Sequence, residues 1–181
     1  MKILQAAISD VLLVQPDLHQ DERGSFFESF NQKDFREFTG IKSIFVQENT
    51  VRSKKNVLRG LHFQVQKPQA KLVQVVQGQI FDVAVDIRKS SPSFGKWVGF
   101  ILTGDNRNQL WVPEGFAHGY VVLSDVADVI YRVTDYYSPA YERVVAWDDP
   151  TIAISWPIDS EPILSMKDST AENLSKLELY L

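Results

Sequence analysis

The sequence predicts an all-β protein, an antiparallel jelly-roll β-barrel with a few short helices. Most of the chain consists of short segments rich in β-branched and aromatic residues, separated by turn residues. Turn signals recur at intervals of roughly 8–12 residues, which is typical of sandwiches and barrels. Helical signals are confined to two short stretches. The length of 181 residues suits one domain, spanning residues 1–181.

The expected elements follow in order along the chain. A short helix over residues 32–38 begins after Asn31, a residue that favours helix starts. Strands are expected at 57–64, 71–77, 79–87, 96–102, 109–112, 115–124 and 126–134. Near the end, Ser169 followed three residues later by Glu172 resembles a capping box, which predicts a helix running towards Leu177.

The segment 79–87 has the cleanest alternation in the chain. One face carries Phe81, Val83, Val85 and Ile87, and the other carries Ile80, Asp82, Ala84 and Asp86. A period of two residues is typical of a strand with one buried face. Gly78 separates this segment from 71–77, so the two strands are expected to be joined or bent at a glycine.

Composition and charge exclude several classes of function. The net charge is −4 with no long run of either sign, which argues against a nucleic-acid-binding surface. Cysteine is absent, so disulfides, thiolate nucleophiles and zinc–thiolate sites are excluded. No apolar run approaches the ~18 residues of a membrane span, and no signal-peptide core precedes the first polar residues. We therefore expect a cytoplasmic protein that does not bind a membrane.

Four ionisable side chains are expected on the apolar faces of four different strands. These are His62, Lys71, His118 and Tyr131, whereas Arg59 is expected to face away from His62. Burial of such groups is unfavourable unless they meet partners or line a cavity, which indicates a small-molecule pocket. Each residue also has a structural alternative: a hydrogen-bonded histidine, a packed tyrosine, or a lysine whose ammonium reaches solvent.

One local pattern raises the question of a metal site. Residues 113–118 have the P-x-G-x-x-H spacing of the second cupin motif. Metal-binding cupins supply two histidines in H-x-H spacing from the first motif, but here Gln64 replaces the second histidine after His62. No Asp, Glu or His lies between Gln64 and Gln79 to complete the three or more ligands of a stable site. The sequence predicts no metal and no other cofactor.

The motifs together resemble a known family. The matching blocks are 21–28 (DERGSFFE), 47–49 (QEN), 57–64 (VLRGLHFQ), 71–73 (KLV), 82–88 (DVAVDIR), 91–95 (SPSFG), 113–119 (PEGFAHG), Tyr131 and 164–168 (LSMKD). They are similar, in this order and over nearly the whole chain, to the dTDP-4-dehydrorhamnose 3,5-epimerases, which have a cupin-type jelly-roll fold. The resemblance implies an isomerase that inverts C3 and C5 of dTDP-4-dehydro-6-deoxy-D-glucose through an enolate, in dTDP-rhamnose biosynthesis.

The resemblance also implies a role for each matching residue. His62 corresponds to the general base, Asp168 to its carboxylate partner, Tyr131 to the general acid, and Lys71 to the cation near the C4 keto oxygen. The substrate-binding residues it implies are Arg59, His118 and Lys167, with Arg23, Phe26, Glu28, Gln47 and Asn49 on the nucleotide side. It further implies a homodimer in which the N-terminal segment reaches the partner subunit.

Three positions depart from the family pattern: Val51 stands where serine is common, Asn56 where glycine often occurs, and Asp148 where asparagine is usual. Asparagine tolerates a left-handed turn, so the loop at Asn56 is expected to be preserved. Three other functions compete with double epimerisation. They are a single-centre epimerase or ketoisomerase on a related dTDP-4-keto sugar, a metal-dependent cupin enzyme, and a non-catalytic binder of sugar nucleotides.

Overall fold

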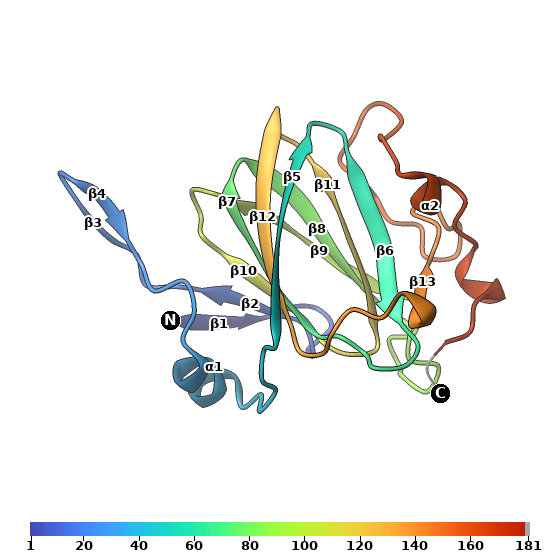
Figure 1. Ribbon diagram of the computed structural model, residues 1–181, viewed down its shortest axis with the longest axis horizontal. Coiled ribbons are helices and arrows are strands. Elements are labelled where there is room, and N and C mark those ends of the chain that lie inside the picture. The colour runs from blue at the N-terminus through green and yellow to red at the C-terminus, as the bar shows by residue number, and fades with distance from the viewer. Residues whose placement is uncertain (180–181) are drawn as a thin grey trace.

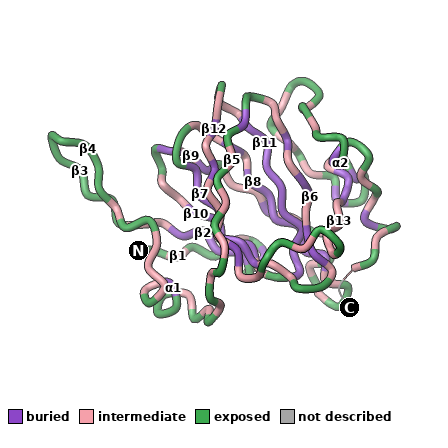
Figure 2. The backbone as a smooth tube through the Cα atoms, in the orientation of Figure 1, coloured by how far each residue is buried: buried purple, intermediate pink, exposed green. Residues whose placement is uncertain are grey.

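Two antiparallel sheets face each other in a jelly-roll arrangement, as predicted. The computed structural model describes residues 1–179. The barrel fills the centre of Figure 1, with a small hairpin projecting from one side and the C-terminal segment covering the other. Figure 2 shows that the buried residues concentrate on the central strands of both sheets.

The first sheet has six strands. Their order across the sheet is β1 (Lys2–Gln5), β2 (Leu12–Gln15), β10 (Gln109–Val112), β7 (Lys71–Gln77), β12 (Val126–Val133) and β5 (Gln47–Lys54). The second sheet has five, in the order β13 (Glu142–Val144), β6 (Leu58–Gln64), β11 (Phe116–Val122), β8 (Gln79–Asp86) and β9 (Trp97–Thr103). The projecting hairpin consists of β3 (His19–Asp21) and β4 (Gly24–Phe26).

The predicted N-terminal helix is present as α1 (Gln32–Thr39). The side chain of Asn31 accepts hydrogen bonds from the backbone N–H groups of Lys33 and Asp34, which satisfies two donors at the helix start. Gly40 ends the helix in the left-handed conformation. Phe35 is the buried residue of this helix and packs against Trp111, so α1 covers part of the outer face of the first sheet.

The prediction of a C-terminal helix was wrong both in the position of the helix and in the residue that caps it. The structure has a four-residue helix, α2 (Met166–Ser169), which Ser165 caps by accepting from the backbone N–H of Asp168. Ser169 is therefore the last helical residue. The later stretch forms only a 3₁₀ turn, η2 (Leu174–Lys176), and a similar turn, η1 (Pro139–Tyr141), precedes β13. The sequence offers two serines at suitable spacing, and the hydrogen bonds of Ser165 select the earlier one.

The expectation that β8 has one buried face was also wrong, because both of its faces are covered. Ile80 and Ala84 belong to the cluster between the two sheets. Val83 and Val85 belong to a second cluster, which lies under the C-terminal segment with Ile152 and Leu174 among its other members. The two aspartates of the strand, Asp82 and Asp86, are consequently fully buried. Strict alternation of apolar and polar residues therefore occurs here in a strand without a solvent face.

The seven predicted strands are all present, with ends within two residues of the predicted ones. The structure adds six strands that the sequence did not predict: β1 to β5 and β13. The left-handed turn expected at Asn56 is confirmed by its φ of 66°. Within residues 1–179, no helix combines the length and the apolar character needed to cross a membrane.

Candidate active site

A cavity of about 320 Å³ opens between the two sheets. Strands β5, β7 and β12 supply one wall, β6 and β11 supply the other, and the segments around residues 137–142 and 167 border it. The polar or aromatic residues that line it are Gln47, Asn49, Arg59, His62, Phe63, Gln64, Gln69, Lys71, His118, Tyr120, Tyr131, Tyr137, Glu142 and Lys167. The cavity therefore holds eight of the twelve predicted site residues.

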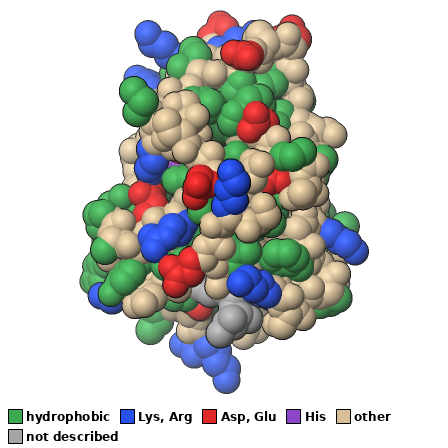
Figure 3. All heavy atoms as spheres, turned by 90° about the vertical axis from the view of Figure 1, so that its right-hand side faces the viewer, with side chains coloured by type: hydrophobic (Ala, Val, Ile, Leu, Met, Phe, Trp, Pro, Cys, Tyr) green, Lys and Arg blue, Asp and Glu red, His purple; other side chains and the backbone are tan. Residues whose placement is uncertain are grey.

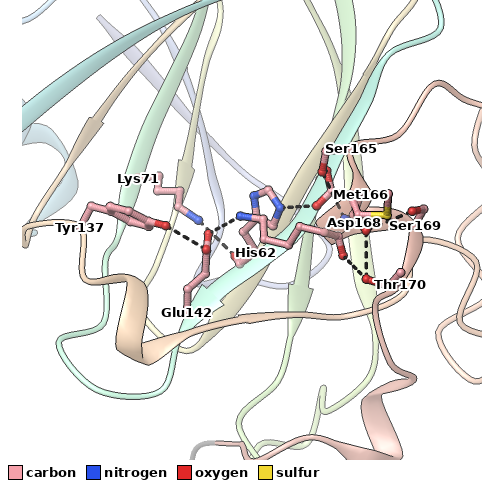
Figure 4. Close-up of polar contacts among 10 residues, drawn as sticks. His62, Lys71, Tyr137, Glu142, Ser165, Met166, Asp168, Ser169 and Thr170 are labelled. Carbon is pink, nitrogen blue, oxygen red and sulfur yellow. Dashed lines mark hydrogen bonds and ion pairs between the residues drawn. The ribbon is translucent and has the colours of Figure 1, made fainter.

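His62 and Asp168 form a hydrogen-bonded pair at this cavity. The distance from His62 Nε2 to Asp168 Oδ1 is 2.6 Å, and Figure 4 shows the two side chains pointing toward one another. The Asp168 side chain is 3% exposed, whereas that of His62 is 28% exposed and reaches the cavity. Burial raises the pKa of Asp168, but the hydrogen bond and charge of His62 outweigh it, so the pKa lies below its ordinary value. The pair is arranged as a base oriented by a carboxylate.

The start of α2 fixes the carboxylate of this pair. Ser165 Oγ donates to Asp168 Oδ2 at 2.8 Å and accepts from the backbone N–H of the same residue at 3.2 Å. Both oxygens of the Asp168 carboxylate are thereby engaged. Because Ser165 also starts the helix, the local fold and the orientation of the carboxylate depend on the same hydroxyl.

A second histidine–aspartate pair lies beside the first. His118 on β11 stands directly opposite His62 on β6 in the strand register. Its Nε2 lies 2.6 Å from Oδ1 of Asp82, which is not among the site residues predicted from the sequence. Burial lowers the pKa of His118, and the charge of Asp82 opposes this shift. The sequence did contain a signal for Asp82: its carboxylate lies on the same strand face as the apolar residues Ile80 and Ala84.

Lys71 places a buried ammonium next to these pairs. The residue is 8% exposed, and its Nζ donates to the backbone carbonyl of His62 at 3.2 Å. Burial lowers the pKa of Lys71 to about 8, partly opposed by the charges of Asp82 and Glu142. The sequence-based alternative of an ammonium reaching solvent is therefore wrong. The site carries a cation whose charge is sensitive to pH near neutrality.

Tyr131 faces the cavity from the opposite sheet. It lies on β12, where it pairs with Asn49 of β5 and Val73 of β7. Burial raises the pKa of its hydroxyl, and the charge of Arg59 opposes this shift. At neutral pH the side chain is therefore a protonated phenol, which can act as a proton donor. His62 and Tyr131 thus bring a base and an acid to one cavity from two different sheets.

The prediction that Arg59 faces away from His62 was wrong, because both residues line the cavity. The pairing of β6 with β11 shifts register between His118 and Tyr120, which interrupts the alternation that the prediction assumed. Gly60 lies at this irregularity with a φ of +117°, and a Cβ there would come within 2.6 Å of the backbone of β11. Glycine is needed for this close approach.

Three further side chains at the cavity form a connected group. Glu142 accepts a hydrogen bond from the hydroxyl of Tyr137 at 3.0 Å and pairs with the ammonium of Lys167 at 2.8 Å. Figure 4 shows Tyr137 and Glu142 on the side of His62 away from Asp168. The sequence predicted only Lys167 of the three, because Tyr137 and Glu142 lie at the ends of an irregular segment with no strand periodicity.

The nucleotide-side residues divide into two places. Gln47 and Asn49 line the cavity, and the Gln47 amide donates to Asn49 Oδ1 at 2.9 Å. Arg23, Phe26 and Glu28 are exposed, the first two in the β3–β4 hairpin, and they do not line this cavity. The whole hairpin is exposed and stands away from the barrel in Figure 2. The structure therefore does not bring these three residues to the site of their own chain.

Metal-ligating side chains are not clustered in the part of the chain that the structure describes: no group of three or more could hold an ion. The amide of Gln64, at the position where metal-binding cupins have histidine, is engaged elsewhere. Its Nε2 donates to the carbonyl of Lys67 at 2.6 Å, and its Oε1 accepts from the N–H of Ser138 at 2.7 Å. On the face that carries the C-terminal segment, Figure 3 shows acidic and basic side chains interspersed rather than gathered by sign.

Comparison with known proteins finds sugar-nucleotide epimerases, among them a 3'-monoepimerase from Streptomyces bikiniensis that is 32% identical, with a TM-score of 0.89 and with 94% and 87% coverage. A family model described as dTDP-4-dehydrorhamnose 3,5-epimerase matches residues 5–176. The chain is 53% identical to the dTDP-4-dehydrorhamnose 3,5-epimerase of Salmonella typhimurium, covering 97% of each chain. It is 50% identical to that of Pseudomonas aeruginosa, covering 99% of each. It superposes with a TM-score of 0.97 on a dTDP-6-deoxy-D-glucose-3,5-epimerase from Legionella pneumophila in complex with dTDP-4-keto-L-rhamnose, at 48% identity and with 99% and 97% coverage.

Proposed function

Since the chain belongs to the dTDP-4-dehydrorhamnose 3,5-epimerase family and is therefore an isomerase, we propose that it inverts C3 and C5 of dTDP-4-dehydro-6-deoxy-D-glucose. The product is dTDP-4-dehydro-L-rhamnose, an intermediate of dTDP-rhamnose biosynthesis. The single observation that carries the proposal is the cavity between the sheets, where the His62–Asp168 pair and Tyr131 approach from opposite walls. We further propose that the enzyme acts in the cytoplasm, where nucleotide sugars are built from nucleotides.

His62 removes the proton. Its Nε2 is engaged with Asp168, so the nitrogen that is free to act as base is Nδ1, an assignment that follows from the hydrogen-bond network. The proton leaves a carbon next to the C4 ketone. Its electron pair forms a double bond between that carbon and C4, and the π electrons of the carbonyl move onto the oxygen to give an enolate. The Asp168 carboxylate stabilises the imidazolium that results. Oriented bases of this kind typically contribute ~10²–10⁴-fold to the rate.

Lys71 stabilises the enolate. Its ammonium comes from β7 into a largely buried part of the cavity, where a charge interaction is stronger than in water. Tyr131 then delivers a proton to the opposite face of the same carbon, and the electron pair returns from oxygen. The phenol takes up a proton from solvent, and His62 loses its proton before the second centre reacts. Each centre is inverted because base and acid stand on different walls.

The remaining site residues bind the substrate in this proposal. Arg59 and Lys167 supply positive charge for the diphosphate, since arginine bonds phosphate oxygens in a bidentate manner. His118, Gln47 and Asn49 contact the sugar and the nucleotide. All five line the cavity beside the acid–base pair.

We propose further that the chain acts as a single-domain subunit of a homodimer in which the β3–β4 hairpin crosses to the partner. The hairpin is exposed along its length, and Phe26 leaves 71% of its surface in solvent. Arg23, Phe26 and Glu28 would then contact the nucleotide in the partner's cavity. An exposed aromatic ring on a projecting hairpin is typical of a segment that packs on another surface.

The test is incubation with dTDP-4-keto-6-deoxyglucose in D₂O, followed by NMR of the exchanged positions. We expect deuterium to be incorporated at both C3 and C5 by the wild-type protein, and at neither centre by His62→Ala. Exchange at one centre only would instead identify a single-centre epimerase, and migration of the keto group a ketoisomerase. Absence of exchange in the wild-type protein that still binds the nucleotide sugar would identify a binder.

A further inference from the structure

The hydroxyl of Tyr120 is a buried hydrogen-bonding group that the folded chain leaves unused. The residue is 4% exposed and lines the cavity. Its hydroxyl has no hydrogen-bond partner among the described residues. Asp82 Oδ2 is the other buried side-chain atom there that lacks a partner. A buried hydroxyl without a partner destabilises a fold, so such groups call for an explanation.

The position of Tyr120 follows from the strand register. It lies on β11 two residues after His118 and therefore on the same face, with the two ring centroids 6.4 Å apart. Across the second sheet it pairs with Arg59 on β6 and with Asp82 on β8. Its ring belongs to the apolar cluster between the sheets. The ring is therefore fixed by packing, and the residue forms part of the wall of the cavity.

The polar neighbours of this hydroxyl do not form hydrogen bonds with it. Ser53 is near enough to oppose part of the rise in the pKa of Tyr120. The hydroxyl of Ser53 accepts from Nε of Arg59 at 3.0 Å, and no hydrogen bond joins it to the hydroxyl of Tyr120. Val51, the next inward residue of β5, is apolar and lines the same cavity. His118 is held by Asp82. The folded protein thus makes no hydrogen bond to the hydroxyl of Tyr120.

We infer that Tyr120 is a further substrate-contacting residue, whose hydroxyl donates a hydrogen bond to an oxygen of the bound sugar diphosphate beside Arg59. The inference rests on the proposed function, which places a sugar nucleotide in this cavity. The unsatisfied donor of the free protein then gains its partner on binding, so the hydroxyl favours the bound state over the free one.

Tyr120 and Tyr131 share the cavity but suit different tasks. Burial raises the pKa of Tyr120 to about 12, with the charge of Arg59 opposing the shift. A phenol with so high a pKa is a poor proton donor to carbon but a persistent hydrogen-bond donor. Tyr131, which is only partly buried, remains the acid of the proposed mechanism.

The test uses Tyr120→Phe, which keeps the packed ring and removes only the hydroxyl. We expect the free variant to melt at the same temperature as the wild type or higher, because an unpaired buried group has been removed. Calorimetry should show that dTDP-glucose, a stable nucleotide sugar, binds roughly five- to tenfold more weakly. The KM should rise by a similar factor, while kcat changes by less than about twofold.

Binding of dTDP alone identifies the acceptor. Equal weakening for dTDP and dTDP-glucose assigns the hydrogen bond to the diphosphate, and weakening for dTDP-glucose alone assigns it to the hexose. Unchanged affinity for both would overturn the inference, as would a lower melting temperature with unchanged affinity, which is the signature of a purely structural tyrosine. The control, Tyr131→Phe, should lose turnover but keep affinity. Since binding is read separately from exchange in D₂O, failure of the proposed reaction and failure of the Tyr120 contact remain distinguishable.

Discussion

At the scale of single residues, Lys71 shows how the site opposes the stability of the fold. Its ammonium is held in a place where the charged form is unfavourable, and burial lowers its pKa from 10.5 to about 8. The folded protein therefore binds this proton less tightly than the unfolded chain does. Below pH 8 both states are protonated and the folded state bears the full penalty, which is about 3 kcal/mol at most. Between pH 8 and 10.5 the penalty declines as the folded state releases its proton first.

Replacing Lys71 by methionine should separate its effect on the stability of the fold from its proposed role in catalysis. We expect Lys71→Met to raise the free energy of unfolding at pH 7 by about 1–3 kcal/mol and to reduce kcat by ~10²-fold or more. The gain in stability should shrink as the pH rises from 8 towards 10.5, and the wild-type kcat should fall over the same range as the cation is lost. Urea titrations and rate profiles at several pH values measure both.

The control for lost charge alone is Lys54→Met at the exposed end of β5. This variant should change neither the rate nor its pH profile. A wild-type rate that stays level well above pH 8 would contradict the role of the Lys71 ammonium.

The sequence located most of the ionisable groups at the cavity, but it did not give the orientation or identity of all their neighbours. Strand alternation placed His62, Lys71 and Tyr131 on inward faces, since it depends only on the pleat. It misplaced Arg59, because a single irregularity in the pairing of β6 reverses the expected face. It missed Glu142, which lines the cavity directly after the turn η1, because that turn has no strand periodicity.

At the scale of elements, α2 is a short helix whose position is set by one hydroxyl. Ser165 caps the helix and also donates to the carboxylate of Asp168. Ser165→Ala should therefore lower the free energy of unfolding by about 0.5–2 kcal/mol. It should also reduce kcat by roughly tenfold, because one oxygen of the Asp168 carboxylate loses its hydrogen-bond donor. Thermal melts and steady-state rates give the two numbers.

Ser169→Ala is the matched control for the cap. Its hydroxyl donates only to the backbone carbonyl of Met166 on the surface. This variant should leave the rate unchanged. If it proved the more damaging of the two, the cap would lie where the sequence first suggested.

The approach of β6 to β11 gives a second test at this scale. Gly60→Ala would force a Cβ to within 2.6 Å of the backbone at Gly119 and His118, in addition to the strain of a positive φ. We expect a loss of about 3–5 kcal/mol in stability and a disordered wall of the cavity. Chemical denaturation measures the change.

Gly40→Ala serves as its control. Gly40 also has a positive φ, of 73°, but a Cβ there meets nothing within 4 Å. Backbone strain alone should cost about 1 kcal/mol. Equal effects of the two substitutions would show that the close approach between strands does not matter.

Local sequence predicted elements where local forces decide them. The helix α1 has its own cap residue and its own terminating glycine, and β7 and β12 carry runs of β-branched residues. By contrast, β5 is a polar edge strand that exists because it pairs along its length with β12. Pairing with a strand some eighty positions away leaves no mark in the segment itself.

At the scale of the whole molecule, the projecting hairpin tests the proposed exchange between subunits. If Arg23 serves the partner's cavity, mixing inactive Arg23→Ala and His62→Ala proteins should restore activity. In a mixed dimer, the subunit with an intact His62 receives an intact Arg23 from the other. Random exchange should give about a quarter of the wild-type rate.

Each variant alone should remain near background after the same treatment, and light scattering should report a dimer throughout. Failure to recover activity, while mass spectrometry shows that mixed dimers have formed, would contradict the exchange.

The order of synthesis gives the pairing of His62 with Asp168 a further consequence. The two residues are 106 positions apart, and the aspartate lies in the segment that closes over the second sheet only after the barrel strands have been made. On the ribosome, both sheets are available for pairing before this segment emerges. A nascent or C-terminally clipped chain therefore lacks both the carboxylate that orients its base and the ammonium of Lys167 at the cavity, so turnover reports that translation has passed this segment.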